Sequence, residues 1–117
     1  MSEDERWPAE WLRGVLELCV LGAMTEGATH GYALARRIES AGLGPVKGGT
    51  LYPLLTRLET DGLVQASWEA GRAGPGRKVF TLTAHGRREA ARRAASWLEF
   101  TRRAQALLPA PTPQEAS

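Results

Sequence analysis

The residues best suited to binding chemistry are cations held in a stretch rich in glycine and proline. Residues 70–78 read AGRAGPGRK, which sets Arg72, Arg77 and Lys78 among three glycines and a proline. Such a stretch is either a solvated linker or a shaped loop that presents basic side chains to an anionic partner. The elements on either side of the loop decide between these two interpretations.

Catalytic and metal chemistry find little support in the sequence. The two histidines, His30 and His85, stand far apart, and with the single cysteine, Cys19, they show no metal-binding spacing. GPGRK lacks the strand–loop–helix context of a phosphate-binding glycine loop. No nucleophile stands in a pattern with a base and an orienting third group. We therefore predict that the protein is not an enzyme and holds no metal or other cofactor.

Charge is distributed unevenly along the chain, although the net charge is only +2. Residues 1–30 carry six acids against two arginines, whereas residues 72–103 carry nine bases against two acids. This asymmetry favours an anionic partner, although solvated helix faces also carry paired arginines. The acidic opening does not resemble a secretory signal, and no segment is apolar enough to span a membrane. We expect a single cytoplasmic domain with no membrane partner.

Two helices are predicted in the first third of the chain. Residues 9–26 have apolar residues at helical spacing, and Gly27 is a stop signal. Thr29 is the predicted N-cap of a second helix that runs to Ser40. The inner face of this second helix is predicted to hold Tyr32, Leu34, Ala35 and Ile38.

A third helix is predicted over residues 50–62. Its leucines fall at i, i+3, i+4 and i+7, which is typical of one buried face. Because proline is tolerated best in the first helical turn, Pro53 predicts a start near Thr50, with Thr50 as N-cap. Gly62 is the predicted stop. The leucines concerned are Leu51, Leu54, Leu55 and Leu58.

A hairpin and a long helix complete the predicted domain. Residues 63–69 and 77–83 are short and rich in β-branched and aromatic residues, so the glycine-rich stretch joins two strands. Thr83 then caps a helix that reaches Leu108, with apolar or small residues at heptad-like spacing. The tail, residues 109–117, is predicted to be disordered. The predicted self-pairing positions are Ala90, Ala94, Trp97, Leu98, Thr101, Ala104 and Leu108.

The predicted order, three helices followed by a hairpin and a long helix, is that of a winged helix-turn-helix. The fold class is α+β and mostly α, with residues 9–82 as the DNA-binding domain and 83–108 as a C-terminal dimerisation helix. In helix-turn-helix proteins the later helix enters the major groove with its N-terminal residues at the base edges. The predicted DNA-binding residues are Lys47, Thr50, Tyr52, Pro53 and Arg57 at this helix, and Arg72, Arg77 and Lys78 in the wing.

Three segments also carry a family resemblance. THGYALARRIE, then GTLYPLLTRLETDGLVQASWE, then GPGRKVFTLTAHG, in this order and spacing, resemble the PadR family of winged-helix transcriptional regulators. The likeness extends over about residues 11–108. It implies a homodimer built through the C-terminal helix, a recognition helix at residues 50–61 and a basic wing. The single C-terminal helix resembles the short-bodied branch, whose members are usually repressors released by a small effector.

Several single residues have a structural and a functional interpretation. The wing cations either keep a loop soluble or contact phosphates, Thr50 either caps a helix or meets DNA, and Tyr52 is either an aromatic at the core edge or a phosphate donor. Trp97 either packs in the dimer or sandwiches a planar aromatic effector. The second interpretation follows from a resemblance, because the segment RRAASWLEF is similar at Trp97 to a multidrug-sensing member of the family whose paired tryptophans bind a ligand in this way. Trp7 and Trp11 are candidates to line the same space.

We therefore predict a sequence-specific DNA-binding regulator, a homodimer that acts as a repressor on a pseudo-palindromic operator. The alternative is a winged-helix module that binds other proteins and not DNA.

Overall fold

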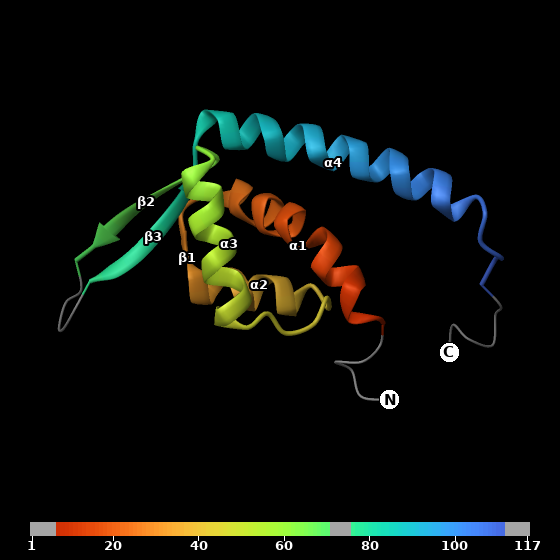
Figure 1. The fold of residues 1–117 in the computed structure, drawn as a ribbon, viewed down its shortest axis with the longest axis horizontal. Helices are drawn as coiled ribbons and strands as arrows, with labels where there is room; N and C mark the ends of the chain where they lie inside the picture. Colours follow the sequence, from red (N-terminus) through yellow and green to blue (C-terminus); the bar gives the residue numbers. More distant parts are fainter. Residues whose placement is uncertain (1–6, 71–75, 112–117) are drawn as a thin grey trace.

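The structure, a computed structural model, describes residues 7–70 and 76–111. Three helices form a bundle beside a small antiparallel sheet, and a long last helix crosses over the bundle (Figure 1). The predicted α+β, mostly helical fold is confirmed. In chain order the elements are α1 (Ala9–Ala23), the short 3-10 helix η2 (Met24–Glu26), β1 (Thr29–His30), α2 (Gly31–Ser40), α3 (Gly48–Thr60), β2 (Val64–Glu69), β3 (Arg77–Leu82) and α4 (Ala84–Gln105).

The sheet has three strands in the order β1-β3-β2. The predicted hairpin is confirmed: β2 and β3 pair from Val64 opposite Leu82 to Glu69 opposite Arg77. β1, which was not predicted, pairs Thr29 with Phe80. Thr29 is therefore a buried strand residue and not the predicted cap of α2, whose N-cap His30 makes no side-chain capping bond. Two residues are too few to show the alternation that marks a strand in a sequence.

The core consists mainly of leucines from the three-helix bundle. The predicted face of α3 is confirmed, because Leu51, Leu54, Leu55 and Leu58 are all buried. They pack with Leu34 and Ile38 of α2, with residues of α1 and with the inner side of the sheet. Tyr32 was wrongly placed on the inner face of α2, since its side chain is 69% exposed. An aromatic at the first turn of that helix satisfies the apolar period but lies beyond the edge of the core.

The start of α3 differs from the prediction. The helix begins at Gly48, with Lys47 as N-cap, and the carbonyl of Lys47 accepts bonds from the N–H groups of Thr50 and Leu51 at 3.0 and 2.9 Å. Thr50 is therefore inside the helix and is not its cap. Pro53 falls in the second turn, where it has no N–H to donate to the carbonyl of Gly49, and Gly49 is exposed.

The first and last helices are both shorter than predicted. α1 ends at Ala23, and the tighter turn η2 continues to Glu26 before Gly27, which adopts a φ of 133°. α4 ends at Gln105, three residues before the predicted Leu108. The predicted disorder of the tail concerns mostly residues 112–117, which lie outside the described residues. In the segments 7–70 and 76–111, no helix has the length and apolar character needed to cross a membrane.

Thr83 anchors α4 to the turn that follows α3. Its hydroxyl accepts a bond from the N–H of Gly86 at 2.9 Å, which confirms the predicted cap, and donates to the carbonyl of Gly62 at 2.6 Å. The N–H of Thr83 donates to the carbonyl of Leu63 at 3.1 Å. A Cβ at Gly86 would overlap that same Leu63 oxygen. The base of α4 therefore meets the α3–β2 turn at a distance that only glycine permits.

We predict that Gly86→Ala lowers the free energy of unfolding by about 2 kcal/mol or more, because the overlap is with backbone that is already hydrogen-bonded. Gly22→Ala is the matched control, because it lies in α1 with no atom within 4 Å of an added Cβ. The control should be neutral or stabilising by up to about 1 kcal/mol. Urea denaturation measures both, and equal effects would contradict this account.

Candidate nucleic-acid interface

The start of α3 gathers four of the residues predicted to meet DNA. Because the leucines of α3 point into the core, Thr50, Tyr52 and Pro53 lie on its exposed face, and Lys47 is exposed at the N-cap. The N-terminus of a helix carries partial positive charge from its unpaired N–H groups. A cation and two hydroxyls therefore stand where a helix already favours an anion.

Tyr52 combines the two roles that the sequence left open. A Cβ added at Gly31 would lie 2.6 Å from the Tyr52 hydroxyl oxygen, so the ring packs directly over the start of α2. The side chain nevertheless remains 48% exposed. Tyr52 thus helps to dock the two helices of the helix-turn-helix and still presents part of its ring to solvent.

Sequence reasoning missed a polar pair on α2. Arg36 donates from Nη1 to the hydroxyl oxygen of Tyr32 at 3.1 Å, and its guanidinium carbon lies 5.8 Å from the ring centroid. The i, i+4 spacing of Tyr32 and Arg36 was a usable signal. The prediction that Tyr32 lies on the inner face of α2 excluded it from a pair with the exposed Arg36. An exposed aromatic beside a cation adds a second polar surface to the same two helices.

The hairpin places two of the three predicted wing cations on β3. Arg77 and Lys78 are both exposed. The Lys78 ammonium lies 3.9 Å from a carboxylate oxygen of Glu59 on α3 and 5.6 Å from the Phe80 ring centroid. Arg72 lies outside the described residues. The hairpin projects from the bundle beside α3 (Figure 1). The ion pair between Lys78 and Glu59 therefore links β3 to α3 in addition to their contacts in the core.

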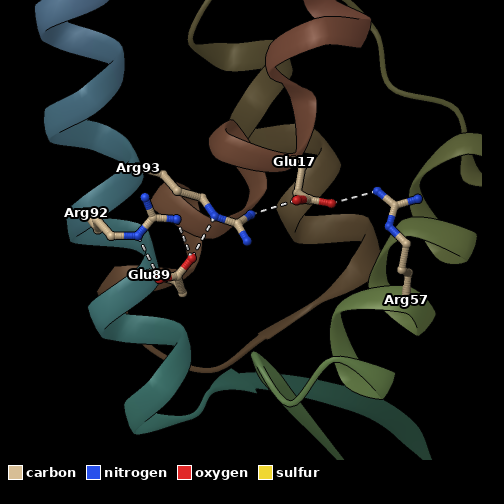
Figure 2. Close-up of polar contacts among 5 residues, drawn as sticks. All are labelled: Glu17, Arg57, Glu89, Arg92 and Arg93. Carbon is tan, nitrogen blue, oxygen red and sulfur yellow. Dashed lines mark hydrogen bonds and ion pairs between the residues drawn. The ribbon is translucent and has the colours of Figure 1, made fainter.

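Arg57 does not join the residues at the start of α3. Its Nη2 donates to Oε1 of Glu17 on α1 at 2.6 Å, and Figure 2 shows the guanidinium directed at that carboxylate. The prediction that Arg57 contacts DNA followed from its place one turn after the start of the helix. The structure gives it a partner 40 residues earlier in the chain, which spacing along α3 cannot reveal.

Glu17 belongs to a line of ion pairs across three helices. Its second oxygen, Oε2, accepts from Nη1 of Arg93 on α4 at 2.6 Å, and Arg93 also pairs with Glu89 (Figure 2). The hydrogen bond from Arg57 and the one from Arg93 lower the pKa of Glu17, although partial burial opposes them. Hydrogen bonds from Arg92 and Arg93 lower the pKa of Glu89 from 4.5 to about 2.

The three tryptophans named as effector candidates line one cavity between α1 and the second half of α4. Its volume is about 730 Å³, and Trp97 stacks on Phe100 with ring centroids 5.8 Å apart. Trp97 is 38% exposed and Trp11 is 62% exposed. We call this space the tryptophan cavity. Its main lining side chains are Trp7, Trp11, Leu12, Val15, Leu43, Trp97, Phe100, Thr101, Ala104 and Leu108.

The predicted self-pairing positions of α4 are divided by the packing of α1. Ala90 is only 4% exposed and belongs to the core of its own chain, so it was wrongly assigned to the dimer seam. Ala94 and Leu98 are exposed, and Thr101, Ala104 and Leu108 border the tryptophan cavity. The heptad-like spacing therefore has two causes along α4. At the start of the helix it reflects packing within the same chain, whereas the later positions lie outside the core of that chain.

The fold and its basic, exposed α3 start define a winged helix-turn-helix protein. Residues 20–92 match the model of the transcriptional regulator PadR-like family, and the chain belongs to this family. A PadR family transcriptional regulator from Eggerthella lenta is similar in structure, with a TM-score of 0.76 and 33% identity, over 87% of this chain and 88% of that one.

Two further similarities extend the comparison. Bacillus subtilis PadR in complex with operator DNA has a TM-score of 0.61 at 23% identity, over 87% of this chain and 51% of that one. A 37.1 kDa protein of transposon Tn4556 from Streptomyces fradiae is 39% identical over 90 residues, or 74% of this chain. The present chain spans about a quarter, 24%, of that curated relative.

The lowered pKa of Glu89 predicts a pH dependence of stability. A carboxylate whose folded pKa lies below its unfolded value stabilises the fold above the unfolded pKa, and this contribution is lost as pH falls through the folded one. Glu89→Gln should therefore lower the melting temperature at pH 7. The difference from the wild type should shrink between pH 4.5 and about 2. Melting curves followed by circular dichroism measure this, and a difference that stays constant with pH would contradict it.

Proposed function

We propose that this protein is a sequence-specific DNA-binding regulator of transcription, a homodimer that acts as a repressor released by a small apolar effector. The observation that carries the proposal is the start of α3, where Lys47, Thr50, Tyr52 and Pro53 are exposed beside a basic hairpin. The operator complex of Bacillus subtilis PadR, which shares the fold, supports DNA as the partner. Chromosomal DNA as the target implies a cytoplasmic location.

DNA binding would use two kinds of contact. The start of α3 enters a major groove about 12 Å wide, which accommodates one helix, and reads base edges there. Lys47, Arg77 and Lys78 meet phosphates, which position the protein without specifying sequence. Arg72 in the loop is proposed to act with them. Arg57 is left out of this set because Glu17 holds its guanidinium.

Dimerisation through α4 is supported by the apolar surface that the single chain leaves uncovered. Leu98 is 67% exposed, and Trp11 and Phe100 are exposed by more than half. Trp11 and Phe100 border the same cavity, and exposed apolar side chains that lie together commonly mark an interface. A two-fold axis through α4 would place two copies of α3 on the same face of a pseudo-palindromic duplex, one helical turn or about 34 Å apart.

The tryptophan cavity supports a planar aromatic effector. Aromatic side chains bind planar apolar ligands by stacking and by burial of surface, and a cavity of about 730 Å³ falls within the range of small-molecule sites. The same space borders the proposed dimer face. An effector that occupies it would therefore alter how the two copies of α4 meet, which offers a route to release from DNA.

We predict that replacement of Lys47, Arg77 and Lys78 by glutamine weakens binding to all DNA sequences alike. The salt dependence should flatten by about one unit of slope for each phosphate group that is no longer bound. Gel shifts on the promoter region of the protein's own gene, over a salt series, measure this. Arg102→Gln, on α4 and paired with Glu99, is the control. If the wild type fails to bind even at low salt, a protein-binding module is the better interpretation.

We predict that Trp97→Ala abolishes the quenching of tryptophan fluorescence by planar aromatic compounds. Trp68→Ala is the matched control, because Trp68 is exposed on β2 and does not line the cavity. The control should retain the affinity of the wild type. Sedimentation of both variants shows whether the dimer persists. Unchanged ligand affinity in a Trp97→Ala dimer would exclude the cavity as the effector site.

A further inference from the structure

Glu17 is a single side chain that joins the recognition helix to the long C-terminal helix. It lies on α1, between the two, and each of its carboxylate oxygens accepts from a different arginine at 2.6 Å. Oε1 binds Arg57 of α3, and Oε2 binds Arg93 of α4 (Figure 2). The two arginines are 40 and 76 residues distant in the chain. The carboxylate thus closes a tertiary contact that spans three helices.

The other arginine–glutamate bonds on α4 have a different character. Arg92 pairs with Glu89, and Arg102 and Arg103 pair with Glu99, all at i, i+3 or i, i+4 on the same helix. Such pairs stabilise a helix but do not fix its position relative to the other helices. Glu17 differs because its bonds cross between elements. Charge-assisted hydrogen bonds are directional, whereas contacts among leucines tolerate small rotations.

We propose that Glu17 is a positioning residue for DNA binding, which sets the orientation of α3 relative to α4 and thereby the half-site spacing that the dimer accepts. The inference rests on the proposed function, because it needs a dimer that pairs through α4 and reads DNA with α3. Arg57 and Arg93 are the two arms through which Glu17 acts. None of the three residues contacts DNA.

The geometry makes half-site spacing the sensitive quantity. α4 has 22 residues and is therefore about 33 Å long at 1.5 Å per residue. This length is comparable to the ~34 Å that separates half-sites one turn apart. A small rotation of α3 about the base of α4 therefore displaces the recognition helix along the duplex. One base-pair step is about 3.4 Å, so a modest change of angle is enough to favour the wrong spacing.

A competing account makes Arg57 a contact to a DNA phosphate, with the hydrogen bond from Arg57 to Glu17 keeping its guanidinium away from the DNA. The two accounts predict opposite results. If Arg57 is a phosphate contact, its loss weakens binding and flattens the salt slope, and the loss of Glu17 frees it and strengthens binding. If both residues position α3, their losses have the same effect, which is on spacing and not on the salt slope.

The test compares three variants of the full chain on matched duplexes. Wild-type protein first selects its best duplex from a randomised library, and versions with one base pair added or removed between the half-sites are then made. Glu17→Gln keeps the size of the side chain but leaves one acceptor oxygen, so it serves one arginine at most. Arg57→Gln breaks the α3 arm alone. Glu99→Gln is the control, because Glu99 bonds to Arg102 and Arg103 on its own helix and to neither arm.

We expect Glu17→Gln and Arg57→Gln each to reduce the discrimination between correct and altered spacing by roughly three- to tenfold. Affinity for a single half-site and the salt slope should stay as in the wild type. Glu99→Gln should keep full discrimination. Melting temperatures measured in parallel show whether each variant is folded. If Glu17→Gln does not fold, Arg93→Lys provides a milder change of the α4 arm.

Two results would overturn the inference. Full discrimination in folded Glu17→Gln protein would give the residue a role in stability alone. Opposite changes in affinity for Glu17→Gln and Arg57→Gln would make Arg57 a DNA contact. Failure of the wild-type protein to select any duplex is a separate outcome, because it would refute the proposed function before the variants are compared.

Discussion

The burial of one leucine face of α3 is the constraint on which the rest of the structure depends. Four leucines of this helix are packed against α1, α2 and the sheet. Fixing that face inward fixes the opposite face outward, and it also brings the end of α3 to the turn from which the hairpin begins. The exposed residues at the helix start, the place of the wing and the contact of α3 with Glu17 all follow from this one packed face.

Much of the fold could be predicted because its main signals are local. The leucine spacing of α3, the two β-rich segments and the Thr83 cap each lie within a few consecutive residues, and each was located correctly. The errors arose where a distant segment decides the outcome. Thr29 becomes a strand residue because Phe80 lies opposite it, and Ala90 is buried because it belongs to the core that α1, α2, α3 and the sheet form.

The candidate site divides in the same way. Exposure of Lys47 and Tyr52 follows from helical period, once the inward face is known. The bond between Arg57 and Glu17, by contrast, joins residues 40 positions apart and has no trace in the pattern of either helix. The three tryptophans meet at one cavity only because α4 turns back along α1 after the hairpin. Residue types alone indicate which interactions a side chain can make, but which side chains lie next to one another is seen only in the structure.

The tryptophan cavity also has a consequence for the amount of protein that a cell must hold. In the proposed dimer, a second copy would cover Trp11 and Phe100, which the single chain leaves exposed, and part of the stability of each chain would come from that contact. Folding and self-association are then linked by mass action, so dilution weakens both together. A regulator built in this way is sensitive to its own concentration. Its abundance sets the fraction of chains that are assembled, and through it the occupancy of any DNA site that requires two.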